Sequence, residues 1–361
     1  MPKNAYIHIP FCKSKCNYCS FISFVDLELK DAYLYALKKQ ITCEYKGEKL
    51  NTLYFGGGTP SLLNIDDYID LFSFLKFENN AEITVEVNPN NIYLEYLEEL
   101  YRLGVNRLSI GAQTFNDETL KLIGRKHNST QITAAVKCAK EAGFKNISLD
   151  LIYGLPNQTI NDFLEDLKLA VNAGIQHISI YGLKIEDGCY FYINHPKDLP
   201  DLDLQAEIYL KTVEFLKNAG FNHYEISNFA KFGFESKHNL NYWDNNSYYG
   251  FGCSASGYLG NIRYTNKTDL QKYIEKPLSK SFGQELSKQE ILEEAIFLGF
   301  RKISGIDIEE INKNFDINFE QKYTKILQKY SEYFIKTQKG YALTVNGILI
   351  SNDILAEFIS D

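Results

Sequence analysis

Three cysteines near the start of the chain have the clearest chemical potential. Cys12, Cys16 and Cys19 follow a C-x3-C-x2-C spacing, and no fourth cysteine stands nearby. Cysteine thiolates are the usual protein ligands of iron–sulfur clusters, and a four-iron cluster has four irons to ligate. Three cysteines would therefore hold three irons and leave the fourth iron open to a small molecule. A structural zinc site is the alternative, with His8 or a distant residue as its fourth ligand.

The zinc alternative fits this spacing less well. Zinc sites favour two Cys-x2-Cys pairs separated by a longer spacer, and structural sites close all four positions around the ion. This chain has one short group of cysteines without a second half. The other four cysteines are isolated in the sequence, and we expect reduced thiols in a cytoplasmic protein. They are Cys43, Cys138, Cys189 and Cys253.

The elements that must position the cysteines alternate between strand and helix over the first 220 residues. Short β-rich runs predict strands at Ala5–Phe11, Thr52–Gly56, Glu82–Val87, Arg107–Gly111, Asn146–Ile152 and His177–Tyr181. Helices are predicted near 28–46, 66–76, 92–103, 129–142, 160–173 and 203–218. Four of these helices end at a glycine, as a left-handed cap requires: Gly104, Gly143, Gly174 and Gly220. The pattern predicts an α/β fold, an open or partial (β/α)6 barrel covering residues 1–220.

The carboxyl ends of the predicted strands carry the unusual residues of the chain. Functional sites of βα barrels gather at this end of the strands. We therefore expect one barrel mouth to collect Cys12, Gly57–Thr59, Glu86, Gln113, Asp150 and Leu183.

Two further segments follow the predicted barrel. Residues 221–283 are rich in Tyr, Asn, Phe and Gly, and we expect them to close the barrel. Residues 284–361 predict a small helical, winged-helix-like domain, with a hairpin of Tyr341–Val345 and Ile348–Ile350 around Asn346-Gly347. This last segment has 9 Lys and Arg against 13 Asp and Glu, and the whole chain has a net charge of −8. Such a balance argues against a nucleic-acid partner.

The N-terminal residues contain no apolar signal core, and no apolar run reaches the length of a membrane span. We therefore expect a cytoplasmic protein.

Six motifs, in this order, resemble the oxygen-independent coproporphyrinogen III oxidases and their relatives, which belong to the radical S-adenosylmethionine (SAM) superfamily. The motifs are YIHIPFC from Tyr6, GGGTPS from Gly56, EVNP from Glu86, SIGAQTF from Ser109, Gly124-Arg125 and DLIYGLP from Asp150. The resemblance runs from Tyr6 to about residue 260. It implies a 4Fe-4S cluster on Cys12, Cys16 and Cys19, with SAM on the open iron. It also implies that SAM is contacted by Tyr6, Gly57, Gly58, Thr59, Glu86, Gln113, Arg125 and Asp150. Thr59 stands where the superfamily more often has Glu.

Two functions occur among these relatives. The oxidase uses SAM to decarboxylate two porphyrinogen propionates, whereas the HemW-type chaperones carry haem b to respiratory apoproteins. Oxidases usually have a fourth cysteine two residues after the third, where this chain has Phe21, and they carry an N-terminal extension before the cluster motif. The segment His238-Asn-Leu-Asn-Tyr242-Trp243 matches the HNxxYW pattern of the chaperones. These features favour the chaperone, and the oxidase is the alternative.

The HNxxYW segment also suggests where haem would bind. Haem needs an axial donor such as His, Cys or Tyr together with an apolar surface. His238, Tyr242 and Trp243 are therefore the candidate haem residues. The alternative is an aromatic patch that seals the barrel, with the histidine held by hydrogen bonds. Dimerisation and transient contact with a membrane are expectations from the family, and no residue of the chain provides separate evidence for them.

Overall fold

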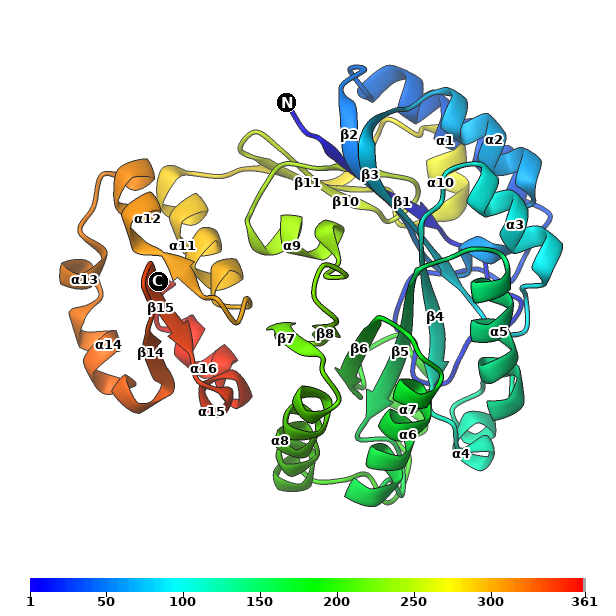
Figure 1. The fold of residues 1–361 in the computed structure, drawn as a ribbon. Coiled ribbons are helices and arrows are strands. Elements are labelled where there is room, and N and C mark those ends of the chain that lie inside the picture. The colour runs from blue at the N-terminus through cyan, green and yellow to red at the C-terminus, as the bar shows by residue number, and fades with distance from the viewer. Residues whose placement is uncertain (360–361) are drawn as a thin grey trace.

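A nine-stranded sheet forms the centre of the protein in the computed structural model, which describes residues 1–359 (Figure 1). Its strand order is β7-β8-β6-β5-β4-β3-β2-β1-β9. The strands are β1 (Asn4–Ile9), β2 (Lys49–Gly57), β3 (Lys76–Val87), β4 (Arg107–Gln113), β5 (Asn146–Tyr153), β6 (His177–Gly182), β7 (Asn222–Glu225), β8 (Asn228–Ala230) and β9 (Tyr249–Phe251). Strands β1 to β6 are parallel neighbours in chain order, which confirms the six-stranded partial barrel.

Helices cover one side of the curved sheet, and the C-terminal domain lies beyond its other side (Figure 1). The helices up to the barrel's end are α1 (Lys30–Glu44), α2 (Ile65–Ser73), α3 (Leu94–Arg102), α4 (Asp117–Leu122), α5 (Ser129–Glu141), α6 (Ile160–Asn172), α7 (Tyr190–Ile193), α8 (Leu202–Asn218), α9 (Lys237–Trp243) and α10 (Leu270–Glu275). All six predicted helices are present, while the short α4 and α7 were not predicted.

The glycines predicted to end four helices have the required backbone conformation. Their φ angles are +100° at Gly104, +103° at Gly143, +69° at Gly174 and +79° at Gly220. Only glycine adopts this left-handed region without steric cost, so each helix ends there and the chain turns into the next strand. These four positions fix the spacing of the helix–strand units.

The sheet continues past residue 220, where the sequence predicted the barrel to end. Strands β8 and β7 extend one edge in antiparallel fashion, and β9 pairs in parallel with β1 at the other edge. A separate three-stranded sheet follows, formed by β10 (Ser256–Leu259), β11 (Ile262–Asn266) and β12 (Lys280–Glu285). The segment predicted to close the barrel therefore supplies strands to its sheet.

The C-terminal domain combines helices with a small sheet of order β13-β15-β14, as a winged-helix-like domain should. Its elements are α11 (Lys288–Gly299), β13 (Ile306–Asp307), α12 (Ile308–Phe315), α13 (Phe319–Lys322), α14 (Thr324–Lys329), β14 (Phe334–Lys336), β15 (Gly340–Leu343), α15 (Val345–Leu349) and α16 (Ser351–Ala356).

The hairpin predicted around Asn346-Gly347 is wrong. Residues Val345–Leu349 form helix α15, because the Thr344 side chain accepts a hydrogen bond from the Gly347 backbone N–H and caps the helix. The actual hairpin lies one element earlier, between β14 and β15.

Across residues 1–359, no helix has both the length and the apolar character needed to cross a bilayer.

Candidate functional site

The three cysteines lie on the loop between β1 and α1, and backbone hydrogen bonds hold this loop at several points. The Cys12 N–H donates to the Phe24 carbonyl at 3.0 Å, and the Phe24 N–H donates to the Pro10 carbonyl at 2.7 Å. Farther along, the Asn17 N–H donates to the Ile123 carbonyl at 3.0 Å. The loop is therefore fixed at its base and against the end of α4.

His8 supports the same loop from within the barrel. One ring nitrogen, Nε2, lies 3.0 Å from the Ile22 carbonyl oxygen, and Nδ1 lies 3.0 Å from the Tyr6 hydroxyl. Because a carbonyl only accepts, Nε2 carries the proton and Nδ1 accepts from Tyr6. Burial lowers the pKa of His8, which favours this neutral form. Both nitrogens are thus occupied, so His8 positions the loop and is not available as a zinc ligand.

A cavity of about 430 Å³ opens beside the cysteines at the carboxyl ends of the strands. Ten of the eleven residues predicted to bind the cluster or SAM line it: Cys12, Cys16, Cys19, Gly57, Gly58, Thr59, Glu86, Gln113, Arg125 and Asp150. Tyr6 is the exception, since its ring stacks on Tyr54, which lines the cavity, with 6.1 Å between the centroids. The strand ends therefore meet at one mouth, as their parallel order predicted.

The donor set fits a cluster better than a single ion. All three thiols are unpaired and partly exposed. Within residues 1–359, no three His, Cys, Asp or Glu side chains form a group that could hold one metal ion. A four-iron cluster presents a separate iron to each cysteine, so its ligands need not converge on one point. Burial raises the pKa of the Cys19 thiol to about 11, so ligation by iron would have to displace its proton.

The glycine run after β2 is required by the close approach of β1 and its loop. A side chain on Gly57, which has φ +108°, would lie 2.5 Å from the His8 ring. A Cβ on Gly58 would lie 2.6 Å from the Phe11 carbonyl oxygen. Backbone atoms cannot yield as a flexible side chain can, so Gly58 has no tolerance for substitution. Packing against the cysteine loop between β1 and α1 is therefore enough to require glycine at both positions, in addition to any contact with a ligand.

Glu86 is an acid of the cavity whose ionisation is strongly perturbed. Its carboxylate accepts hydrogen bonds from the Tyr54 hydroxyl at 2.8 Å and from the Gly57 backbone N–H at 3.2 Å. Burial nevertheless outweighs these bonds and raises the pKa of Glu86 to about 7. The carboxyl group is therefore poised between its two protonation states near neutral pH, and a bound cation would favour the ionised form.

Asp150 and Gln113 complete the wall of the cavity from β5 and β4. Burial raises the pKa of Asp150, although hydrogen bonds from the Ser109 hydroxyl, at 2.9 and 3.0 Å, oppose the rise. Gln113 has φ +68°, an uncommon value for a residue with a side chain, and it follows an irregularity in the pairing of β4 with β5. This irregular backbone places Gln113 at the cavity.

Arg125 reaches the cavity from the segment after α4. Its guanidinium donates to the Asn88 side-chain oxygen at 2.6 Å and to the Gly111 carbonyl at 2.7 Å, and it lies 3.7 Å from the Cys16 sulfur. Its buried Nε has no partner among the described residues. The positive charge of this guanidinium beside the cavity suits an anionic ligand group.

Asn88 and Tyr54 belong to the site, but the sequence reasoning gave neither a role. Both line the cavity and bond directly to residues that were predicted. A signal was present, since both residues stand inside or beside the motifs that carry the family resemblance.

The candidate haem residues lie elsewhere and do not form an open metal site. His238 is 1% exposed, and its ring nitrogens lie 2.7 Å from the Thr52 hydroxyl and 2.7 Å from the Tyr242 hydroxyl. The Trp243 indole is half-buried beside Glu225. Because both imidazole nitrogens are occupied, His238 offers no free donor to iron. This geometry matches the alternative, a hydrogen-bonded histidine that seals the barrel.

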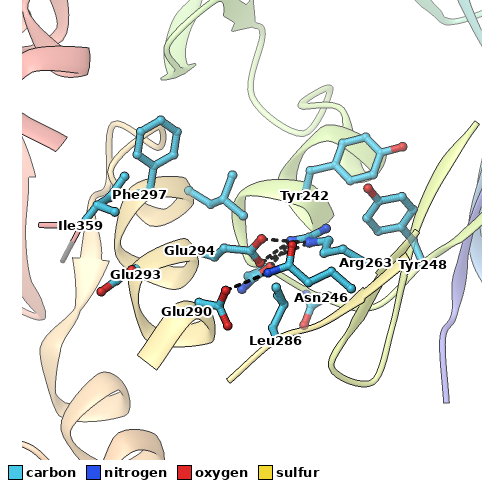
Figure 2. A pocket seen from close by; sticks show the side chains of 13 residues that line it. Tyr242, Asn246, Tyr248, Arg263, Leu286, Glu290, Glu293, Glu294, Phe297 and Ile359 are labelled. Atoms are coloured by element: carbon cyan, nitrogen blue, oxygen red, sulfur yellow. Dashed lines mark hydrogen bonds and ion pairs between the residues drawn. The ribbon is translucent and has the colours of Figure 1, made fainter. Parts of the chain in front are cut away.

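A second cavity, of about 570 Å³, lies between α9, β11 and α11 (Figure 2). The ring of Tyr242 lines it, while its hydroxyl is bonded to His238. Arg263 bridges the two sides through an ion pair with Glu294 at 2.8 Å. Glu290 and Glu293 also line the cavity, so its charged groups are mainly acidic. These acidic groups repel carboxylates, so this cavity is poorly suited to haem, which carries two carboxylates.

Family profiles match two parts of the chain. The radical SAM superfamily profile matches residues 6–170, and the HemN C-terminal domain profile matches residues 286–349. The first covers the cysteine loop and strands β1 to β5, and the second covers most of the C-terminal domain.

Individual relatives match the chain from end to end. The heme chaperone HemW of Lactococcus lactis is 38% identical and covers 100% of this chain and 98% of its own length. The heme chaperone HemW of Bacillus subtilis is 36% identical, with coverage of 99% and 100%. The structure of the coproporphyrinogen III oxidase HemN of Escherichia coli superposes with a TM-score of 0.87 at 26% identity, over 99% of this chain and 90% of that one. The chain therefore belongs to the HemW family of the radical SAM superfamily, and the relatives named here from that family are haem chaperones.

Proposed function

We propose that this protein binds haem b and delivers it to respiratory apoproteins. The observation that carries the proposal is the end-to-end similarity to relatives named haem chaperones, which extends through both the barrel and the C-terminal domain. The position two residues after Cys19 adds support, because it holds Phe21 where the oxidases have cysteine. Phe21 is 67% exposed and lies at the edge of the cysteine cavity. Seven unpaired cysteines favour a cytoplasmic location.

We further propose that Cys12, Cys16 and Cys19 hold a 4Fe-4S cluster and that SAM occupies the open iron. Such a cluster, when bound, can supply an electron for reductive cleavage of SAM. The chain's own contribution is to bind and orient the cofactor. Glu86 and Asp150 offer carboxylates for its ammonium and ribose hydroxyls, and Arg125 offers the positive charge of its guanidinium for its carboxylate.

An anaerobic haemin titration of the cluster-loaded protein tests the chaperone proposal directly. A sharp endpoint in the Soret band at a fixed stoichiometry supports it, and transfer to an apo-cytochrome then becomes the second assay. Binding that never saturates would contradict it. The Cys16→Ser variant is the matched control, because it separates haem binding from cluster loading.

The oxidase remains the second candidate, because the HemN structure matches nearly the whole chain. Conversion of coproporphyrinogen III under reducing conditions with SAM would favour it. An absence of conversion by protein with full iron content and demonstrated SAM binding would leave the chaperone as the better proposal.

A further inference from the structure

Asn88 connects two side chains that approach two different cysteines of the proposed cluster. On one side, the Arg125 guanidinium donates to the Asn88 oxygen at 2.6 Å and to the Cys16 sulfur at 3.7 Å. On the other side, the Asn88 amide nitrogen donates to the Thr59 hydroxyl oxygen at 3.1 Å. The Thr59 hydroxyl in turn lies 3.5 Å from the Cys12 sulfur.

The direction of these hydrogen bonds follows from the chemistry of arginine. A guanidinium has donors and no acceptor, so the oxygen of Asn88 must face Arg125 and its nitrogen must face Thr59. The Thr59 oxygen therefore accepts from Asn88, which leaves its single hydroxyl proton to point at Cys12. Thr59 is only 4% exposed, so water does not compete freely for this proton.

We propose that Asn88 is a positioning residue that aims donors from Thr59 and Arg125 at the Cys12 and Cys16 thiolates. Hydrogen bonds to cluster sulfurs withdraw charge from the iron and raise the reduction potential of the cluster. The two hydrogen bonds that Asn88 positions would therefore make the cluster easier to reduce. It also gives a purpose to Thr59, at the position where the superfamily more often has Glu. The proposal rests on the proposed cluster and is independent of haem binding.

Neighbouring groups pack around Asn88 and Arg125. A Cβ on Gly111 would lie 3.3 Å from the Arg125 guanidinium, which is closer than an ordinary contact, and 3.6 Å from the Asn88 oxygen. The Asn88 backbone N–H also lies 3.4 Å from the Ser61 hydroxyl. These contacts hold the amide at a fixed place between β3 and the cluster loop.

The test is a potentiometric titration of the reconstituted cluster, followed by electron paramagnetic resonance without SAM. Thr59→Val removes the hydroxyl and keeps the shape, and Thr59→Ser keeps the hydroxyl. Loss of one charge-assisted bond changes the reduction equilibrium constant by about tenfold, which is about 59 mV for a one-electron couple. We expect Thr59→Val and Asn88→Ala to shift the midpoint to more negative potential by at least this amount, and Thr59→Ser to retain the wild-type value.

Asn90→Ala is the matched control, because Asn90 is an exposed asparagine two residues away. The Thr59→Val change should also have a smaller effect when Asn88 is already alanine, since the hydroxyl is then no longer aimed. Unchanged midpoints in cluster-loaded Thr59→Val and Asn88→Ala would overturn the proposal. If Asn88→Ala loads no cluster, the valine and serine pair at position 59 still decides it. Failure of the wild type to assemble any cluster would instead refute the proposed cofactor.

Discussion

Glu86 gives the sharpest prediction from the structure, and the change that tests it is Glu86→Gln. Burial raises the pKa of Glu86 from 4.5 to about 7, so the folded protein holds a proton there that the unfolded chain has already lost. Stability contributed by this proton is fully present below pH 4.5 and falls as the pH rises toward 7. The interval corresponds to a loss of about 3 kcal/mol in the free energy of unfolding. Glutamine has no such proton to lose.

The replacement should be accommodated without a new unsatisfied group. The glutamine oxygen can accept from the Gly57 N–H, and its amide can donate to the Tyr54 hydroxyl, which acts equally well as an acceptor. At pH 8 the variant should therefore be more stable than the wild type, whereas at pH 4.5 the two should be equal. With an unfolding entropy of about 2.1 cal/mol/K per residue, about 3 kcal/mol corresponds to a rise in Tm of about 4 °C.

The assay is thermal unfolding of SAM-free protein, as both the wild type and Glu86→Gln, at half-unit intervals from pH 4.5 to 8. The difference between the two Tm values isolates Glu86 from other titrating groups. Parallel curves across this range would refute the reasoning, because they would mean that Glu86 ionises as it does in water. If Glu86 binds the SAM ammonium as proposed, the wild type's SAM affinity should also fall about tenfold per pH unit below pH 7.

Three further predictions concern the cysteine loop between β1 and α1, the glycine run that packs against it, and His238. Cys16→Ser should abolish the visible absorption of the cluster, and a fully loaded four-iron cluster in this variant would contradict the ligand assignment. Gly58→Ala should also prevent loading of the cluster, because its Cβ would lie 2.6 Å from the Phe11 carbonyl oxygen. Gly283→Ala, which has open space around it, should load the cluster normally, and iron analysis distinguishes the two variants. His238→Ala should lower the free energy of unfolding by about 3 kcal/mol and leave the Soret maximum of the haem complex unchanged, because the histidine is occupied internally; a shifted maximum would restore it as a haem ligand.

The barrel could be predicted because its signals are local. Helix-ending glycines, such as Gly104 and Gly143, fix each turn within a few residues, and parallel strands then bring their carboxyl ends together without further information. The position of Glu86 beside the cysteines followed from this order alone. Strand β9 could not be predicted, since its three residues are defined by pairing with β1, more than 200 positions earlier. The hairpin predicted at Asn346-Gly347 was wrong for a local reason. The Thr344 side chain caps helix α15, and this cap outweighs the turn preference of the two residues.

The roles of polar side chains were the least predictable part, because each depends on which way a hydrogen bond runs. At His238 the direction is set from Asn4: the Thr52 hydroxyl donates to the Asn4 oxygen at 2.9 Å, so it must accept from the histidine Nδ1. The other ring nitrogen is then an acceptor for Tyr242. Burial lowers the pKa of His238 to about 3, which keeps the ring neutral and this order intact.

The orientation of Asn88 is fixed in the same way, but here by a donor. Arg125 can only donate, so the Asn88 oxygen faces Arg125 and its amide nitrogen faces Thr59. In both places a group that can only donate or only accept a hydrogen bond fixes the role of a neighbour that could do either. The motif HNxxYW suggested an iron ligand at His238, whereas in the fold both ring nitrogens of this residue have hydrogen-bond partners. The motif EVNP suggested nothing for Asn88, yet its fixed orientation points a hydroxyl at a cysteine. Chemical type is therefore visible in the sequence, whereas availability for chemistry is decided by partners that only the fold brings together.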